Sequence, residues 1–336
     1  MDRIEYVDLL KFLAITAIIF LHICGIWEST GILNVNFDHL REIFRFGVPL
    51  FLAVTGMLTL NKEIELDTFF KKKFVRIVYP LIFFFIIAYL LNIYELIQFF
   101  VKFWYCWMII GVYLAIPIVN IFIKNAREKD IEYALIIFLI ASVIYYLASI
   151  FEMEVSLDLS FFITPISYLV LGYWLSRKEF KSSPQTIVLI SFITFVLISL
   201  FKIVVIKDFL YFNDHGPLYS RVSYNLSDII QVASVFLFCR YLYEVRTGIA
   251  NYLRRIVEYN YIQKFIESVS RASYGIYLLH MIFILKFIKK LGKYHMSGTE
   301  TFFAVIVVST LLLITTWICI LILSRIPVIK KFSGYS

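Results

Sequence analysis

Continuous apolar runs, each close to the length that crosses a lipid bilayer, dominate the sequence. They lie at about residues 6–26, 43–60, 74–93, 103–123, 132–150, 160–176, 185–206, 227–243, 269–290 and 301–324. A helix needs roughly 20 apolar residues to cross the hydrocarbon core. Because the runs are continuous and do not alternate, they favour membrane helices over a β-barrel. The sequence therefore predicts an all-α integral membrane protein with about ten transmembrane helices.

Composition agrees with this class. Hydrophobic residues make up 61% of the 336 residues, charged residues only 17%, and the mean hydropathy is +0.84. A soluble domain has about 25% charged residues. The net charge of +8 sits in short segments between the runs and indicates membrane topology, not nucleic-acid binding. The four cysteines are scattered and predict neither a disulfide framework nor a metal site.

Basic residues orient the predicted helices. With the N-terminus in the cytoplasm, 21 Lys and Arg residues fall inside and 10 outside, which predicts that both termini are cytoplasmic. The segment with Lys286, Lys289, Lys290 and Lys293 falls outside, against this trend, so the number of spans there stays open. No repeat or linker is visible, and we expect one polytopic domain over residues 1–336, with an uncleaved first helix and no fused soluble domain.

The first apolar run carries three polar residues that lipid disfavours: Asp8, Lys11 and His22. On a helix, Lys11 and His22 lie about three turns apart on one face, roughly 16 Å along the axis. Asp8 shares that face and is placed to pair with Lys11. Ionisable groups in a span usually face the protein interior or a water-filled cavity, although Asp8 and Lys11 are also placed to reach the interface. A neutral imidazole at His22 is suited to act as a general base.

Several blocks of the sequence together resemble the membrane acyltransferase 3 family, in family order along the whole chain. Members carry Arg or Lys, ten residues and then His, as Lys11 and His22 do here. The other blocks are RFGVPLFLAVTGML (45–58), FFKKKFVRIVYP (69–80), FWYCWMIIGVYLAIPIV (103–119), ISYLVLGYWLS (166–176) and SRASYGIYLLH (270–280). The chain is most similar to the stand-alone O-acyltransferase branch. It departs from the family where Lys11 replaces the frequent Arg and Thr55 the frequent Ser.

The resemblance implies transfer of an acyl group from a cytoplasmic acyl-CoA, such as acetyl-CoA, to a hydroxyl of a glycan or lipid-linked sugar. It implies a cell-membrane enzyme that uses acyl-CoA as a co-substrate and holds no bound cofactor. His22 would act as general base or form an acyl-imidazole, and Lys11, with Asp8 one turn before it, would neutralise charge on the pantetheine or thioester path. The basic residues Lys71, Lys72, Lys73 and Arg76 would hold the CoA phosphates, or only anchor a cytoplasmic loop.

Further residues are candidates for the acceptor side or for structure. Arg45 begins the second predicted helix at the outer side, and Trp104 lies in an aromatic block that also fits an interfacial belt. Tyr277 and His280 lie one turn apart on the ninth predicted helix, where a core histidine is at least as good an interpretation as a catalytic one. The outer loop at 207–228 is a weaker candidate.

Other features complete the expectations. Gly56, Gly172 and Gly275 are expected to allow close helix packing. His39, His215 and His295 show no ligand-like spacing, so no metal is expected. Expected partners are acyl-CoA, the sugar acceptor and membrane lipids, but no nucleic acid, and a homo-oligomer is possible. The alternatives are a multi-pass transporter or flippase of a glycan or small metabolite, and a non-catalytic membrane sensor or complex subunit.

Overall fold

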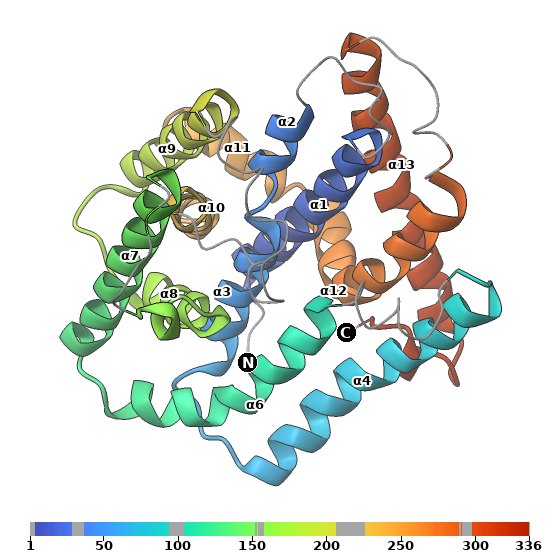
Figure 1. Ribbon diagram of the computed structural model, residues 1–336, viewed down its shortest axis with the longest axis horizontal. Helices are drawn as coiled ribbons and strands as arrows, with labels where there is room; N and C mark the ends of the chain where they lie inside the picture. The colour runs from blue at the N-terminus through green and yellow to red at the C-terminus, as the bar shows by residue number, and fades with distance from the viewer. Residues whose placement is uncertain are drawn as a thin grey trace. The chain divides into compact units, whose positions relative to one another are not determined.

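The computed structural model describes residues 4–28, 37–93, 104–151, 153, 158–205, 226–288, 290 and 298–335. Within these ranges the regular structure is helical, which confirms the predicted all-α class for the described part of the chain (Figure 1). The α-helices are α1 (Glu5–Glu28), α2 (Phe37–Ile43), α3 (Gly47–Thr59), α4 (Leu66–Leu90), α6 (Trp104–Asn125), α7 (Glu128–Ile150), α8 (Pro165–Arg177), α9 (Pro184–Val205), α10 (Leu226–Leu242), α11 (Ile249–Val257), α12 (Asn260–Phe283) and α13 (Gly298–Arg325). A π-helix at Ile284–Ile288 continues α12, and short 3₁₀ turns lie at Ser160–Phe162 and Lys330–Phe332.

Among the described residues, 8 helical segments are long and apolar enough to cross a membrane. They are Glu5–Ile26, Leu40–Thr59, Leu66–Leu90, Trp104–Asn125, Glu128–Ala148, Pro184–Ile203, Asn260–Ile288 and Gly298–Arg325. The other two predicted spans correspond to shorter helices, α8 with 13 residues and α10 with 17. Thirteen helical residues cover only about 20 Å, less than the hydrocarbon core. Most of α8 is buried within the protein.

Some helix boundaries differ from the predicted ones. Helix α4 begins at Leu66, so the basic residues 71–73 and Arg76 lie on a helix and the predicted basic loop is wrong. Lysine is a good helix former, and Asp67 in the first turn suits the positive end of the helix dipole. Pro80 consequently lies inside α4 and not at its start.

The connection between α10 and α12 contains a helix that the sequence placed in a cytoplasmic loop. Helix α11 exposes apolar side chains, including Ile249 and Tyr252, and carries Arg254 and Arg255 in its last turn. Helix α12 begins at Asn260, earlier than predicted. The apolar run that begins at residue 269 indicates only the part of α12 suited to lipid, and the helix extends beyond that run. Most of the outer loop predicted at 207–228, together with Lys289 and Lys293, lies outside the described residues.

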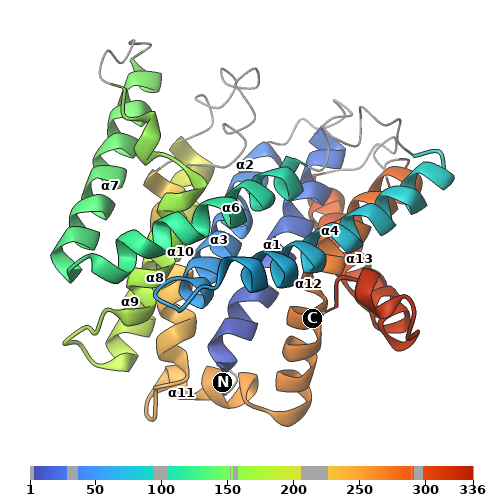
Figure 2. The same ribbon diagram turned by 90° about the horizontal axis from the view of Figure 1, so that it is seen from below.

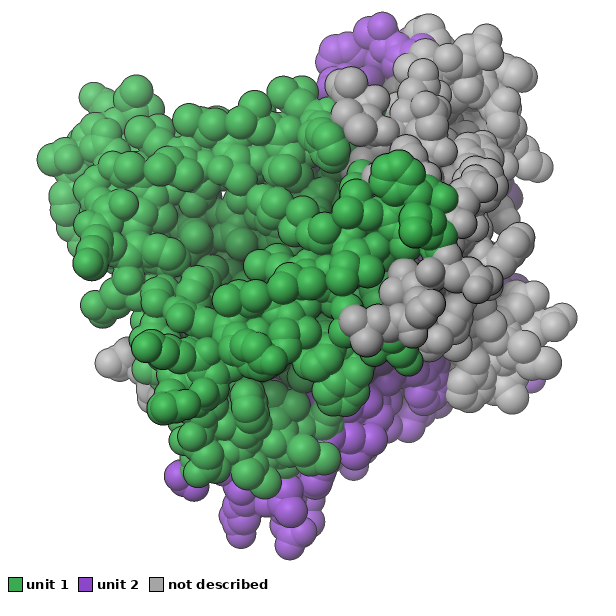
Figure 3. All heavy atoms as spheres, turned by 60° about the vertical axis from the view of Figure 1, so that its left-hand side comes forward, with its two compact units in different colours: residues 1–14, 45–62, 115–266 green, residues 15–44, 63–114, 267–336 purple. Residues whose placement is uncertain are grey.

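The chain divides into two compact units, which Figure 3 colours separately. Unit 1 contains residues 1–14, 45–62 and 115–266, and unit 2 contains residues 15–44, 63–114 and 267–336. Three helices, α1, α6 and α12, contribute residues to both units. The expectation of a single polytopic domain stays a prediction.

In unit 1, α3 and α8 cross at two glycines (Figures 1 and 2). A Cβ atom on Gly56 would lie 2.5 Å from the Cα of Leu169, and closer still to its carbonyl oxygen. A Cβ atom on Gly172 would likewise lie 2.5 Å from the Cα of Ala53. The two backbones touch because neither glycine has a side chain, which confirms the prediction that Gly56 and Gly172 allow close packing.

Unit 1 also contains a buried polar network between α9 and α10, helices that pack extensively along each other. Lys202 forms an ion pair with Asp228, and both side chains are 1% exposed. The Lys202 ammonium also donates to the Gln231 amide oxygen at 2.6 Å, and Gln231 donates to the Ser199 hydroxyl at 2.9 Å. Asp228 and Gln231 therefore hold the charge of Lys202 inside the unit.

In unit 2, the C-terminal segment packs against α12 and α4. A Cβ atom on Gly275 would lie 2.8 Å from the Ile320 side chain and closer to the Ser333 carbonyl oxygen, so Gly275 also permits close packing. The Phe332 ring stacks on Tyr79 of α4, with centroids 5.5 Å apart. The Tyr274 hydroxyl of α12 donates to the Ile77 carbonyl at 2.8 Å, three residues before Pro80. These contacts join α4, α12 and the C-terminal segment.

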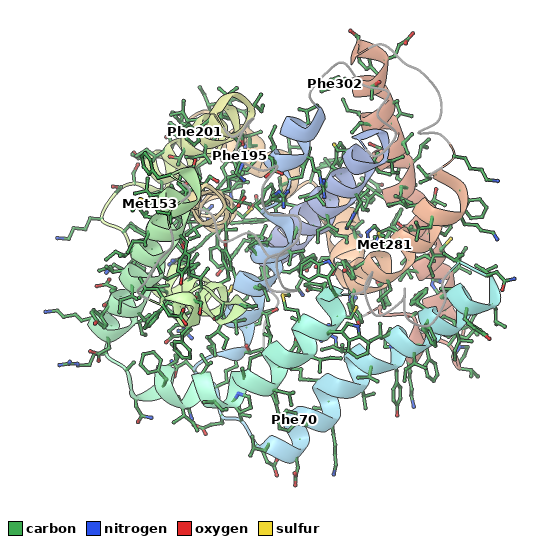
Figure 4. All side chains as sticks on the ribbon, viewed as in Figure 1. Phe70, Met153, Phe195, Phe201, Met281 and Phe302 are labelled. Carbon is green, nitrogen blue, oxygen red and sulfur yellow. The ribbon has the colours of Figure 1, made fainter. Side chains whose placement is uncertain are left out.

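The outward faces of the long helices are apolar, as a lipid environment requires. Figure 4 labels Phe201 on α9 and Phe302 on α13 among these side chains, and they are 41% and 43% exposed. Along α4, Ile82 and Ile86 are exposed in the same way. Large exposed apolar faces would be unfavourable in water but suit contact with acyl chains.

Candidate functional site

Two histidines from different helices meet in unit 2. His22 lies in the second half of α1, and His280 lies near the end of α12. Their ring centroids are 5.3 Å apart, with the ring planes inclined by 44°. His22 is half-buried, whereas His280 is completely buried. His22, which the sequence predicts as the catalytic base, therefore contacts His280, which the sequence offered as an acceptor-side or structural residue.

The protonation of His280 follows from its backbone contact. Its Nδ1 lies 3.2 Å from the Ile276 carbonyl oxygen, which is one turn earlier on α12. A carbonyl oxygen only accepts, so Nδ1 carries a proton, and when the ring is neutral Nε2 carries the lone pair. Nε2 is buried, and among the described residues nothing hydrogen-bonds to it. The site thus contains a basic nitrogen in a water-poor environment.

Aromatic side chains cover the histidine pair. Tyr277 precedes His280 by three residues, so both side chains share a face of α12, and their ring centroids are 5.4 Å apart. Tyr105 of α6 packs on Tyr277 with a centroid distance of 4.7 Å. Trp104, the candidate from the sequence, is half-buried next to Tyr105. Tyr105 was not predicted, although it lies in the aromatic block FWYCW that the sequence singled out.

A buried thiol and a third tyrosine lie close to this aromatic layer. Cys106 is completely buried and interacts with the hydroxyl of Tyr274. The Tyr274 hydroxyl also donates a hydrogen bond to the Ile77 carbonyl of α4. These contacts join α6, α12 and α4 close to Tyr105 and Tyr277, the tyrosines that pack near His280.

The remaining candidates of the first helix lie at its other end. Asp8 and Lys11 are half-buried and belong to unit 1, where the carboxylate of Asp8 is close enough to influence Tyr243. Helix α1 is unbroken from Glu5 to Glu28. Lys11 therefore precedes His22 by three turns on one helix, about 16 Å along its axis, as the sequence predicted.

The four basic candidates occupy the first half of α4 in unit 2. Lys71, Lys72 and Arg76 are exposed. Lys73 is half-buried, and its ammonium lies 5.8 Å from the centre of the Tyr113 ring, within cation–π range. Arg76 is near enough to Tyr113 to affect it electrostatically. The cluster combines several positive charges with an aromatic face, which suits a polyanionic ligand with an aromatic base.

Arg45 lies in the turn between α2 and α3 and is half-buried. It belongs to unit 1, whereas His22 belongs to unit 2. Its expected place on the outer, acceptor side therefore stays a prediction.

No group of three or more His, Cys, Asp or Glu side chains that could hold a metal ion occurs within the described ranges. His215 and His295 lie outside those ranges. The expectation that the protein uses no metal stays a prediction.

Comparison with known proteins identifies the family. A family model described as an acyltransferase domain, that of the acyltransferase 3 family, matches residues 4–324. No curated protein and no solved structure matches the chain significantly. The match covers nearly the whole sequence, including α1 with His22 and α12 with His280. The chain therefore belongs to the acyltransferase 3 family, as a multi-pass membrane protein whose family domain implies acyltransferase activity.

Proposed function

We propose that the protein is an O-acyltransferase of the cytoplasmic (inner) membrane. It moves an acetyl or other short acyl group from cytoplasmic acyl-CoA to a hydroxyl of a cell-surface glycan or of its lipid-linked precursor. The observation that carries this proposal is the contact between His22 and the buried His280 inside a domain of acyltransferase type. Acyl transfer to a hydroxyl needs a neutral base at neutral pH, and imidazole is the side chain best suited to it.

The donor end of the site is the basic cluster on α4. Acyl-CoA carries several phosphate charges, and Lys71, Lys72 and Arg76 are exposed to meet them. Lys73 beside Tyr113 offers a further charge at an aromatic face that can receive the adenine. Both termini lie in the cytoplasm in this account, as the distribution of basic residues indicates.

His22 acts as general base in the transfer. It takes the proton of the acceptor hydroxyl while the oxygen forms a bond to the thioester carbonyl carbon. The carbon–sulfur bond then breaks, and the departing CoA thiolate takes the proton from His22, so that ester and CoA thiol are the products. Lys11, with Asp8 one turn before it on α1, supplies positive charge for the thioester path. Trp104 and Tyr277 of unit 2 contribute to binding of the acceptor sugar.

The test uses purified protein in nanodiscs with acetyl-CoA, and measures release of CoA thiol in the presence of bacterial surface glycans. The His22→Ala variant is compared with wild type and with His39→Ala, which removes a histidine that carries no role here. CoA release that requires His22 but not His39 supports the proposal. If wild type and variants consume neither acetyl-CoA nor succinyl-CoA, the proposal fails and a transporter becomes the better account.

A further inference from the structure

The histidine pair in unit 2 contains one polar atom to which the proposed mechanism gives no role. Nδ1 of His280 donates to the Ile276 carbonyl, so its Nε2 carries a lone pair. This Nε2 is buried, and the described residues provide no hydrogen-bond partner for it. Buried acceptors without a donor are unfavourable and rare, so each one in a folded protein calls for a reason.

Protonation of the neighbouring His22 ring explains why His280 keeps an Nε2 atom without a partner. A neutral imidazole has one N–H group, and an imidazolium has two. When His22 takes a proton from the acceptor hydroxyl, that proton sits on the ring nitrogen that faces the substrate, and the N–H group on the other ring nitrogen becomes the stronger donor of a charged ring. The ring of His280 lies with its centroid 5.3 Å from that of His22. Catalytic hydrogen bonds are often long before the substrate binds and shorten as the reaction proceeds.

We infer that His280 is a positioning residue whose Nε2 accepts a hydrogen bond from His22 when His22 becomes an imidazolium. This inference rests on the proposed function. His280 keeps its own proton on Nδ1 throughout, and it neither gains nor loses one in the transfer. Because an N–H group of a charged ring donates more strongly than that of a neutral ring, the bond stabilises the transition state more than the resting enzyme, which is the condition for faster catalysis.

The surroundings of the pair favour this role. Tyr277 of α12 packs on the His280 ring, and Tyr105 of α6 packs on Tyr277. The next groups outward are the Tyr274 hydroxyl and the Cys106 thiol. These groups are phenols and a thiol, which carry no charge in their protonated form. A hydrogen bond to a charged group is stronger in such a water-poor site than in water.

The test compares three variants in nanodiscs, with acetyl-CoA as donor and methyl α-glucoside as probe acceptor. His280→Leu removes the acceptor atom, and His280→Gln restores an amide oxygen near the position of Nε2. Ser309→Ala is the matched control, because Ser309 on α13 is also buried with its hydroxyl unpaired among the described residues. We expect kcat to fall about a hundredfold in His280→Leu with KM for acetyl-CoA unchanged. His280→Gln should recover part of kcat, and Ser309→Ala should retain all of it.

A second readout does not depend on turnover. In protein labelled with ¹⁵N-histidine at mildly acidic pH, wild type should show a downfield, slowly exchanging imidazolium N–H proton. His22→Ala should remove this signal, which assigns it to His22, and His280→Leu should remove it as well. A signal that persists unchanged in His280→Leu overturns the inference, as does an unchanged kcat. Wild-type protein that releases no CoA contradicts the proposed function, and the NMR signal then decides the inference alone.

Discussion

The crossing of α3 and α8 in unit 1 should not tolerate a single added methyl group on either side. In Gly56→Ala the new Cβ would lie 2.5 Å from the Cα of Leu169, and in Gly172→Ala the same distance from the Cα of Ala53. Carbon atoms pack at about 3.5–4.0 Å, so the helices would have to separate by about 1 Å or more. Overpacking of this kind costs about 1–3 kcal/mol, and here backbone must move as well as side chains.

Helix propensity acts in the opposite direction, and a control variant isolates it. Alanine is more favourable than glycine inside a helix by about 1 kcal/mol. A Cβ atom on Gly111 of α6 would meet nothing within 4 Å, so Gly111→Ala should gain from propensity without a clash. We expect a net loss of about 2 kcal/mol for Gly56→Ala and for Gly172→Ala, and no loss for Gly111→Ala.

The assay is thermal unfolding of detergent-solubilised protein, with the three variants heated at the same rate. A loss of about 2 kcal/mol should lower the melting temperature by about 4 °C. Gly111→Ala should melt at or above the wild-type temperature. If Gly56→Ala and Gly172→Ala have the same melting temperature as Gly111→Ala, the backbone contact between α3 and α8 does not exist as described.

Two further predictions concern charged residues. Lys202→Met should destabilise unit 1 by about 3–5 kcal/mol, because it leaves the carboxylate of Asp228 buried without its partner. The double change Lys202→Met with Asp228→Leu should recover most of that loss in the same melting assay, and equal losses for the single and double variants would contradict the buried pair. Replacing the basic residues 71–73 and Arg76 by alanine should raise KM for acetyl-CoA about tenfold or more at low salt without a matching fall in kcat. Steady-state CoA release measures this KM, and Lys129→Ala, which changes another exposed lysine, is the control. An unchanged KM would show that the cluster does not bind the donor.

The sequence predicted helices better than helix ends. Continuous apolar runs indicate where lipid can surround a helix, and α1 and α9 lie close to their predicted limits. The start of α4 was missed because its first turns are polar, and a run of lysines is as compatible with a helix as with a loop. Helix α8 is shorter than its predicted apolar run, and most of it is buried, since an apolar run suits a buried protein core as well as lipid.

In the candidate site, the sequence predicted features within one helix but not the contacts between helices. The spacing of Lys11 and His22 is a property of one helix, so the sequence alone could predict it. The contact between His22 and His280 joins residues of α1 and α12, and no periodicity within either segment encodes it. Tyr105 was missed for the same reason, because its importance comes only from packing on Tyr277. The ion pair between Lys202 and Asp228 also joins two helices and was not foreseen.

The central claim is that His22 makes a covalent transfer possible, and one measurement tests it most directly. Proteoliposomes would present radiolabelled acetyl-CoA to the cytoplasmic face of the protein and bacterial surface glycans to the other face. We predict alkali-labile, ester-linked label on the glycan with wild-type protein and none with His22→Ala at equal protein content. Equal ester formation by both proteins, or label that crosses only as unchanged acetyl-CoA, would contradict the account.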